Sequence, residues 1–217
     1  MERLICLAIG YGFGLLQTGY LYGRAKGIDI RDHGSGNAGT TNALRTLGKK
    51  AGLITFLGDA FKCVFAVLLV WALFHNSCAD IMPLLKLYTG AGVILGHNYP
   101  FYLKFRGGKG IAASAGMFLS FDWIIVGCAL VTFLAAFLLT SYVSVGSLLI
   151  YAGFMIEVVV LGQMGYFEVA QPVLNEMYII AALLTILAFY KHRANIGRLL
   201  KGEENKTILF HKKQGEE

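Results

Sequence analysis

Six long apolar stretches dominate this sequence and constrain its fold more than any other feature. A helix that crosses a bilayer needs about 20 mostly apolar residues. The stretches that come near this length are 4–23, 52–74, 81–96, 124–140, 142–162 and 173–190. Charged residues make up only 15% of the 217 residues, against about 25% in an ordinary soluble domain. The sequence therefore predicts an all-α polytopic membrane protein, with residues 1–217 forming a single membrane-embedded domain.

A shorter apolar stretch, residues 111–121, decides how many times the chain crosses. As a helix it would be only about 17 Å long, at about 1.5 Å per residue. Cytoplasmic segments of membrane proteins are rich in Lys and Arg. Suppose that this stretch crosses the membrane and that the N-terminus lies outside. Then 16 of the 19 Lys and Arg lie in cytoplasmic segments. We therefore predict seven transmembrane helices, one of them short, with a cytoplasmic C-terminus.

The first predicted cytoplasmic segment, residues 34–52, combines glycines, small polar residues and cations. Glycines allow positive φ angles and let backbone N–H groups turn toward an anion. Arg45 adds a planar cation that suits phosphate. The candidate binding residues of this segment are Ser35, Gly36, Asn37, Asn42 and Arg45. We predict an anion-binding loop, and a flexible basic loop is the alternative. The run GSGNAG follows a membrane span rather than a strand, so it does not indicate a dinucleotide fold.

The second segment, residues 96–110, places glycines around a lysine directly before the short apolar stretch. The N-terminus of a helix favours an anion, because its N–H groups are unpaired and its dipole is positive there. Lys104 adds a second cation, and His97 lies at the cytoplasmic end of the third span. The candidate binding residues before the short span are Gly107, Gly108, Lys109 and Gly110. The aromatic residues of this segment are typical of an interfacial belt, which does not explain the glycines.

The third segment begins as the last span leaves the membrane, at residue 191. If the helix continues, His192, Asn195 and Arg198 share roughly one face. Glu203 follows a glycine, so the chain could fold back and bring this carboxylate toward the same face. A basic tail that binds anionic lipid is the alternative interpretation.

Three further polar residues lie inside predicted spans. Asp59 and Lys62 are three residues apart on one face of the second span. Charged residues at such positions usually face the bundle interior and pair. We interpret them as a structural ion pair, with a catalytic role as the alternative. Ser144, near the inner end of the sixth span, is a candidate for substrate binding or for helix packing.

Together, the segments SGNAGTTNALRTLGKKAG (35–52), GHNYPFYLKFRGGKGIA (96–112) and HRANIGRLLKGEE (192–204) resemble the three motif regions of the acyl-phosphate:glycerol-3-phosphate acyltransferase (PlsY) family. The resemblance extends to span count, topology and motif order. It implies transfer of a fatty acyl group from acyl phosphate to the sn-1 hydroxyl of glycerol 3-phosphate, giving lysophosphatidic acid and inorganic phosphate. It also implies a bacterial inner-membrane enzyme of phospholipid synthesis, with its active site on the cytoplasmic side.

The resemblance and the local chemistry together suggest roles for individual residues. The residues expected to be catalytic are Ser35, Arg45, Lys104, His192, Asn195 and Glu203. The remaining candidates are expected to bind substrate, with the glycines of the second segment approaching the acyl phosphate. The proton acceptor stays open between His192, His97 and the departing phosphate. Acyl phosphate carries a good leaving group, so positioning and charge stabilisation suffice without a covalent nucleophile.

The main alternative function is a small membrane transporter for organic phosphates. The ionisable residues cluster on one side rather than along a midplane path, and no inverted repeat is visible, which disfavours it. We expect no cofactor and no metal, because the sequence holds no obvious cluster of metal ligands. The expected partners are the two substrates and the bilayer, without nucleic acid, and without acyl-carrier protein or CoA as direct donor. We expect the protein to work as a monomer.

Overall fold

The computed structural model describes residues 1–207, and every regular element in this range is a helix. Six candidate spans are long and apolar enough to cross a membrane, and one apolar helix is shorter. The spans contain α1 (Glu2–Gly14) with α2 (Thr18–Ala25), α4 (Lys49–Phe74), α5 (Met82–Asn98), α7 (Trp123–Thr140), α8 (Val143–Gln163) and α9 (Gln171–Lys191). The short helix is α6 (Ile111–Phe121). The predicted all-α membrane fold is confirmed, with six candidate spans and one shorter apolar helix at the position expected for the short span.

The span expected over residues 4–23 is divided into two helices by a break after Gly14. The side chain of Gln17 is fully buried at this break, and its amide donates to the carbonyl oxygens of Gly14 and His97. Lys62, from α4, donates to the carbonyl oxygen of Leu16 at 2.6 Å. Because an unpaired carbonyl is costly in an apolar interior, these two polar side chains make the break possible.

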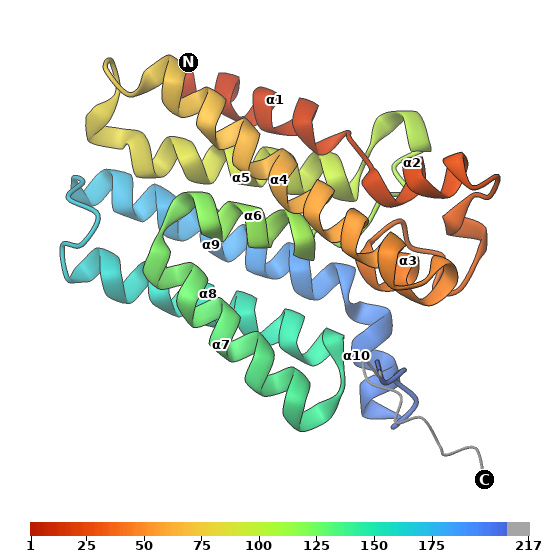
Figure 1. Ribbon diagram of the computed structural model, residues 1–217. Helices are drawn as coiled ribbons and strands as arrows, with labels where there is room; N and C mark the ends of the chain where they lie inside the picture. Colours follow the sequence, from red (N-terminus) through yellow and green to blue (C-terminus); the bar gives the residue numbers. More distant parts are fainter. Residues whose placement is uncertain (208–217) are drawn as a thin grey trace, which may run out of the picture.

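Helices α1 and α5 lie side by side because glycines allow their backbones to approach (Figure 1). A Cβ atom added to Gly92 would lie 2.2 Å from the carbonyl oxygen of Leu7, and one added to Gly96 would lie 2.3 Å from that of Tyr11. Neither contact is possible for a larger residue without moving a helix. Small residues at such spacing are typical of helix pairs in membranes.

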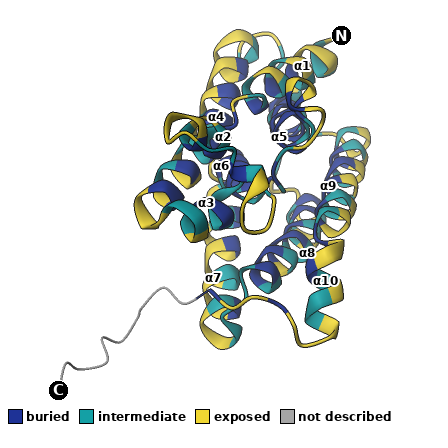
Figure 2. Ribbon diagram, turned by 90° about the vertical axis from the view of Figure 1, so that its right-hand side faces the viewer, coloured by how far each residue is buried: buried dark blue, intermediate teal, exposed yellow. Residues whose placement is uncertain are grey.

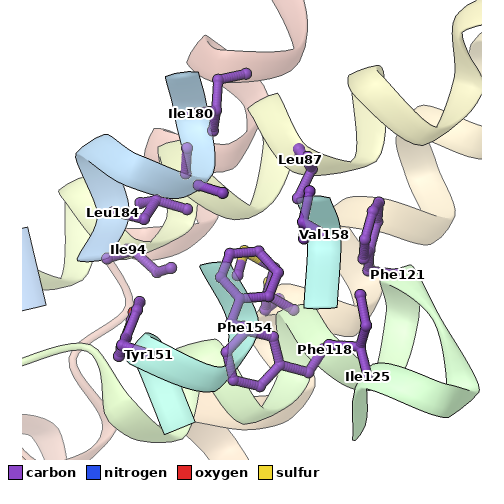
Figure 3. Close-up of a cluster of buried hydrophobic side chains, with 14 of the residues drawn as sticks. Leu87, Ile94, Phe118, Phe121, Ile125, Tyr151, Phe154, Val158, Ile180 and Leu184 are labelled. Atoms are coloured by element: carbon purple, nitrogen blue, oxygen red, sulfur yellow. The ribbon is translucent and has the colours of Figure 1, made fainter. Parts of the chain in front are cut away.

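The apolar core lies where α5, α6, α8 and α9 meet. Figure 3 shows Phe118 of α6 beside Phe154 of α8. The ring centroid of Phe118 lies 4.9 Å from that of Phe154 and 6.1 Å from that of Tyr151, and Leu184 of α9 belongs to the same cluster. Figure 2 shows exposed residues, in yellow, on the outer faces of the helices. Many exposed residues of the membrane helices are large and apolar. Leu139 of α7, for example, is 86% exposed. An apolar outer face of this kind fits contact with lipid tails rather than water.

Shorter elements gather at one end of the bundle. They are η1 (Ile30–Asp32), α3 (Thr40–Leu47), η3 (Phe101–Leu103) and α10 (Arg193–Leu200). Figure 1 shows α2, α3 and α10 at the end where α4 begins and α9 finishes. The three glycine-rich or basic segments therefore share one end of the molecule.

Substituting Ala for Gly92 is expected to lower the free energy of unfolding by about 1–3 kcal/mol, because the new methyl group overpacks the α1–α5 contact. The measurement is the midpoint of thermal denaturation of the protein in detergent. Gly12→Ala on α1 is the matched control, since a Cβ added there meets no atom within 4 Å. Equal midpoints for the two variants would contradict this account of the contact.

Candidate functional site

A cavity of about 160 Å³ lies at the end of the bundle where the three segments meet. Its wall combines α3 and the loop before it with the facing ends of α5, α6, α8 and α9. The predicted site residues that line it are Ser35, Asn37, Asn42, Arg45, His97, Lys109, Gly110, Ser144, His192 and Asn195. Residues distant in the sequence are thus brought to one cavity at the end of the membrane helices.

The loop before α3 is shaped by the buried side chain of Asn42. Its amide nitrogen donates to the carbonyl oxygens of Ile30, His33 and Asn37, and its oxygen accepts from the backbone N–H of Ser35 at 2.8 Å. The polar atoms of Asn42 are therefore engaged with the loop backbone. The loop in turn presents Ser35 at the cavity.

Arg45 lies on α3, a helix that the sequence analysis did not predict. Its guanidinium donates to the carbonyl oxygen of Asn205 at 3.1 Å and to the hydroxyl of Thr207 at 3.0 Å. The backbone N–H of Thr207 donates to the carbonyl oxygen of Ser141. Residues 205–207 therefore connect α3 with the turn between α7 and α8.

The glycines of the second segment pack against His97. A Cβ atom added to Gly108 would lie 2.0 Å from His97 Nε2, and one added to Gly107 would lie 2.0 Å from the His97 carbonyl oxygen. That oxygen accepts from the Gly108 backbone N–H. Gly110 adopts φ +85° just before α6 and does line the cavity. The first two glycines thus allow close packing of the loop, and the third allows the turn into α6.

Lys109 lies between these glycines, and His192 lies at the end of α9. Both side chains face the cavity, and both have a lowered pKa. Burial lowers the pKa of Lys109 to about 8; Glu204 opposes this shift and nearby cations add to it. The Lys109 ammonium donates to Asn195 Oδ1. Burial, assisted by the charge of Lys109, also lowers the pKa of His192 to about 4. At neutral pH the cavity therefore holds a lysine that is mostly charged and a neutral histidine.

The carboxylate that closes the third segment is Glu204, and not Glu203 as predicted. Its Oε1 accepts from Asn195 at 2.7 Å and from Ser144 at 3.2 Å, and its Oε2 accepts from Arg198 at 2.7 Å. Burial by itself raises the pKa of Glu204, but the hydrogen bonds from Asn195 and Arg198 lower it below its ordinary value. Glu203 is exposed.

Several predicted residues lie outside the lining of the cavity. They are Gly36, Lys104, Gly107, Gly108, Arg198 and Glu203. Lys104 is exposed and has φ +54°, in a turn that follows η3. Arg198 acts on the cavity through Glu204. Lys104 has no such link among the described residues.

The sequence analysis missed the apolar part of the wall, which includes Phe56 of α4 and Phe133 of α7. Two phenylalanines in apolar helices give no signal that separates them from lipid-facing ones. Asp59, interpreted as half of an ion pair, also lines the cavity. Within residues 1–207, no group of three or more His, Cys, Asp or Glu side chains is arranged to hold a metal ion.

Comparison with known proteins identifies relatives over nearly the whole chain. The family model described as glycerol-3-phosphate acyltransferase matches residues 4–202. A glycerol-3-phosphate acyltransferase of Clostridioides difficile (strain 630) is 43% identical over 206 residues, or 94% of each chain. Another, of Desulforudis audaxviator (strain MP104C), is 40% identical over 204 residues, also 94% of each chain.

Solved structures give the same match. The crystal structure of PlsY (YgiH), an integral membrane glycerol 3-phosphate acyltransferase, in its glycerol 3-phosphate form has a TM-score of 0.80 at 30% identity, over 96% of both chains. Its lysophosphatidic acid form has a TM-score of 0.78 at 29% identity, with the same coverage. These matches confirm the resemblance carried by the three sequence segments.

Replacing Glu204 by Ala is expected to destabilise the protein by about 2 kcal/mol, because the buried amide of Asn195 loses its charged acceptor. Replacing the exposed Glu203 by Ala is expected to change stability by less than about 0.5 kcal/mol. Chemical or thermal denaturation in detergent measures both. A larger loss for Glu203→Ala than for Glu204→Ala would overturn the assignment of the two neighbours.

Proposed function

The chain belongs to the glycerol-3-phosphate acyltransferase (PlsY) family, and we propose that its acyl donor is acyl phosphate. The enzyme then joins the acyl carbon to the sn-1 hydroxyl oxygen of glycerol 3-phosphate and breaks the acyl–phosphate bond. The hydroxyl proton ends on the departing inorganic phosphate, and lysophosphatidic acid is the other product. The relatives whose structures are solved in glycerol 3-phosphate and lysophosphatidic acid forms support this assignment.

The proposal rests on one observation: cationic and apolar side chains line the same cavity at the end of the membrane helices. Both substrates are anionic, and Arg45 and Lys109 supply positive charge. One substrate also carries a fatty acyl chain, and Phe56 and Phe133 supply an apolar wall on the side of the lipid-facing helices α4 and α7. Positioning and charge stabilisation are the main requirements for transfer from a mixed anhydride.

Within this proposal, the cations and the loop hydroxyl hold phosphate groups. Ser35, Arg45 and Lys109 are the phosphate-binding residues. Gly110 places the N-terminus of α6 beside them at the cavity. Asn195 orients glycerol 3-phosphate and is itself fixed by Glu204. Lys104 is left outside this group, since it is exposed and away from the cavity wall.

We also propose that the cavity opens on the cytoplasmic side of a bacterial inner membrane and that one chain suffices for activity. The distribution of Lys and Arg supports this orientation, because basic segments usually stay in the cytoplasm. Acyl phosphate would then reach the site from the inner leaflet, without acyl-carrier protein or CoA as direct donor.

The test uses purified protein in detergent or lipid mesophase with palmitoyl phosphate and glycerol 3-phosphate. Inorganic phosphate release matched by an equal amount of lysophosphatidic acid is the expected result. Palmitoyl-CoA, supplied as a parallel donor, is expected to give no ester. Product formed from the thioester, or phosphate release without ester, would contradict the proposed donor.

Variants of the proposed phosphate ligands provide the control for this assay. Ser35→Ala and Arg45→Ala are expected to abolish turnover while the protein still inserts into the membrane. Near-normal turnover by either folded variant would reject that residue as a ligand.

The rate should also depend on the charge of Lys109. Its ammonium is present below a pKa of about 8 and is lost as the pH rises. We therefore expect kcat/KM for glycerol 3-phosphate to fall above about pH 8, approaching a tenfold loss per pH unit. Lys109→Arg keeps its charge at higher pH and should move this decline upward by more than one unit. An identical alkaline limb in the two proteins would exclude Lys109 as its source.

A further inference from the structure

A buried group of polar side chains lies directly behind the cavity, beside the break between α1 and α2. Lys62 Nζ lies 2.9 Å from both Asp59 Oδ1 and His97 Nδ1, and 2.6 Å from the carbonyl oxygen of Leu16. The side chains of Lys62, Asp59 and His97 are at most 3% exposed. Asp59 and His97 line the cavity, whereas Lys62 does not. Lys62 therefore reaches a cavity occupant only through its neighbours.

The surroundings of Lys62 decide which atom carries the hydrogen between Lys62 and His97. The Leu16 carbonyl and the Asp59 carboxylate can only accept hydrogen bonds. An ammonium group has no lone pair and can only donate, so the nitrogen of His97 that lies 2.9 Å from it must accept. Leu16 and Asp59 are the other close acceptors, and the Gly14 carbonyl oxygen is farther, at 3.3 Å. Asp59 also balances the buried charge of Lys62, as a buried ion requires. Lys62 therefore donates to His97, whose Nδ1 carries a lone pair and whose Nε2 carries the hydrogen.

We propose that Lys62 is a positioning residue that fixes His97 as the Nε2–H tautomer and so presents a ring N–H donor beside the Gly107–Gly110 loop. Nε2 lies against Gly108, and the contact of the ring with Lys62 is made by the other nitrogen, Nδ1. An N–H donor at this point suits an anionic oxygen next to Lys109. This last step rests on the proposed function, since the acceptor is taken to be an oxygen of a substrate phosphate.

His192 provides an internal reference, because its ring hydrogen is held on Nδ1 rather than on Nε2. Its Nδ1 lies 2.8 Å from the carbonyl oxygen of Ala188, which can only accept. Nδ1 of His192 therefore carries the hydrogen, and its Nε2 carries the lone pair. The cavity thus contains two neutral histidines that present unlike Nε2 atoms, a donor from His97 and an acceptor from His192.

The experiment is ¹⁵N NMR of the full chain with labelled histidine, in detergent at neutral pH. Protonated and lone-pair ring nitrogens give separate signals, and His97→Gln and His192→Gln assign them by loss. In Lys62→Met, the hydrogen of His97 is expected to move toward Nδ1, because Asp59 Oδ1 lies 3.7 Å away and can accept it. The signals of His192 are expected to stay unchanged. The same variant should lose about tenfold in kcat/KM for glycerol 3-phosphate.

Lys191→Met is the matched control, since Lys191 donates to the neighbouring Asn98 carbonyl without touching the His97 ring. It should leave the His97 tautomer unchanged. Hydrogen on Nδ1 of His97 in the wild type, or an unchanged His97 in folded Lys62→Met, would overturn the inference. If Lys62→Met does not fold, the inference is tested by the wild-type protein alone, through the ring nitrogen of His97 that carries the hydrogen. The spectrum needs no turnover, so its failure is distinct from a failure to transfer acyl groups.

Discussion

The structure depends on the way in which the first membrane span is interrupted. A broken helix in an apolar interior exposes carbonyl oxygens that water cannot reach, and each must find a donor from the protein. Gln17 and Lys62 provide those donors. Gln17 also donates to the carbonyl oxygen of His97, at the far end of α5. The interruption therefore fixes the end of α5, and the glycine loop that packs on His97 is fixed with it.

From this anchor, the site is built as two layers. The outer layer is polar and comes from segments beyond the membrane helices, with Arg45 and Glu204 each bonded to a different segment. The inner layer is buried and consists of the Asp59–Lys62 pair and His97. Without the Asp59–Lys62 pair, the side chains of the outer layer would be free to rearrange. The pair limits such movement because it connects the site to three helices.

Much of this arrangement was predictable because apolar length and charge placement are strong signals in a membrane protein. The short stretch 111–121 was predicted with the bounds that α6 has in the structure. The gathering of the three segments at one end followed from span parity. The interruption near Gly14 was not predicted, because nothing in an apolar run signals that Lys62, 46 residues after Leu16, will satisfy its carbonyl.

Two predicted site residues, Lys104 and Glu203, lie outside the cavity wall for the same physical reason, which is the direction in which the chain turns. Gly202 adopts φ +73°, and the turn it allows decides which of two adjacent carboxylates points inward. Composition is identical for Glu203 and Glu204, so only the backbone separates them. In the same way, the left-handed turn at Lys104 leaves its side chain outside the cavity wall. Lys109, in the same glycine-rich segment, does line the cavity.

The position of Glu204 in the chain has a consequence for biogenesis. The cavity wall begins with Ser35 and ends with Glu204, which follows the last membrane helix. During synthesis, all of the spans can therefore enter the bilayer and pack before the wall is complete. A chain that is stalled or cut after α10 would have all the membrane helices of residues 1–207 and would retain Asn195 and Ser144, yet would lack the carboxylate that holds these two side chains. Quality control that senses only membrane insertion would not distinguish such a chain from the finished protein.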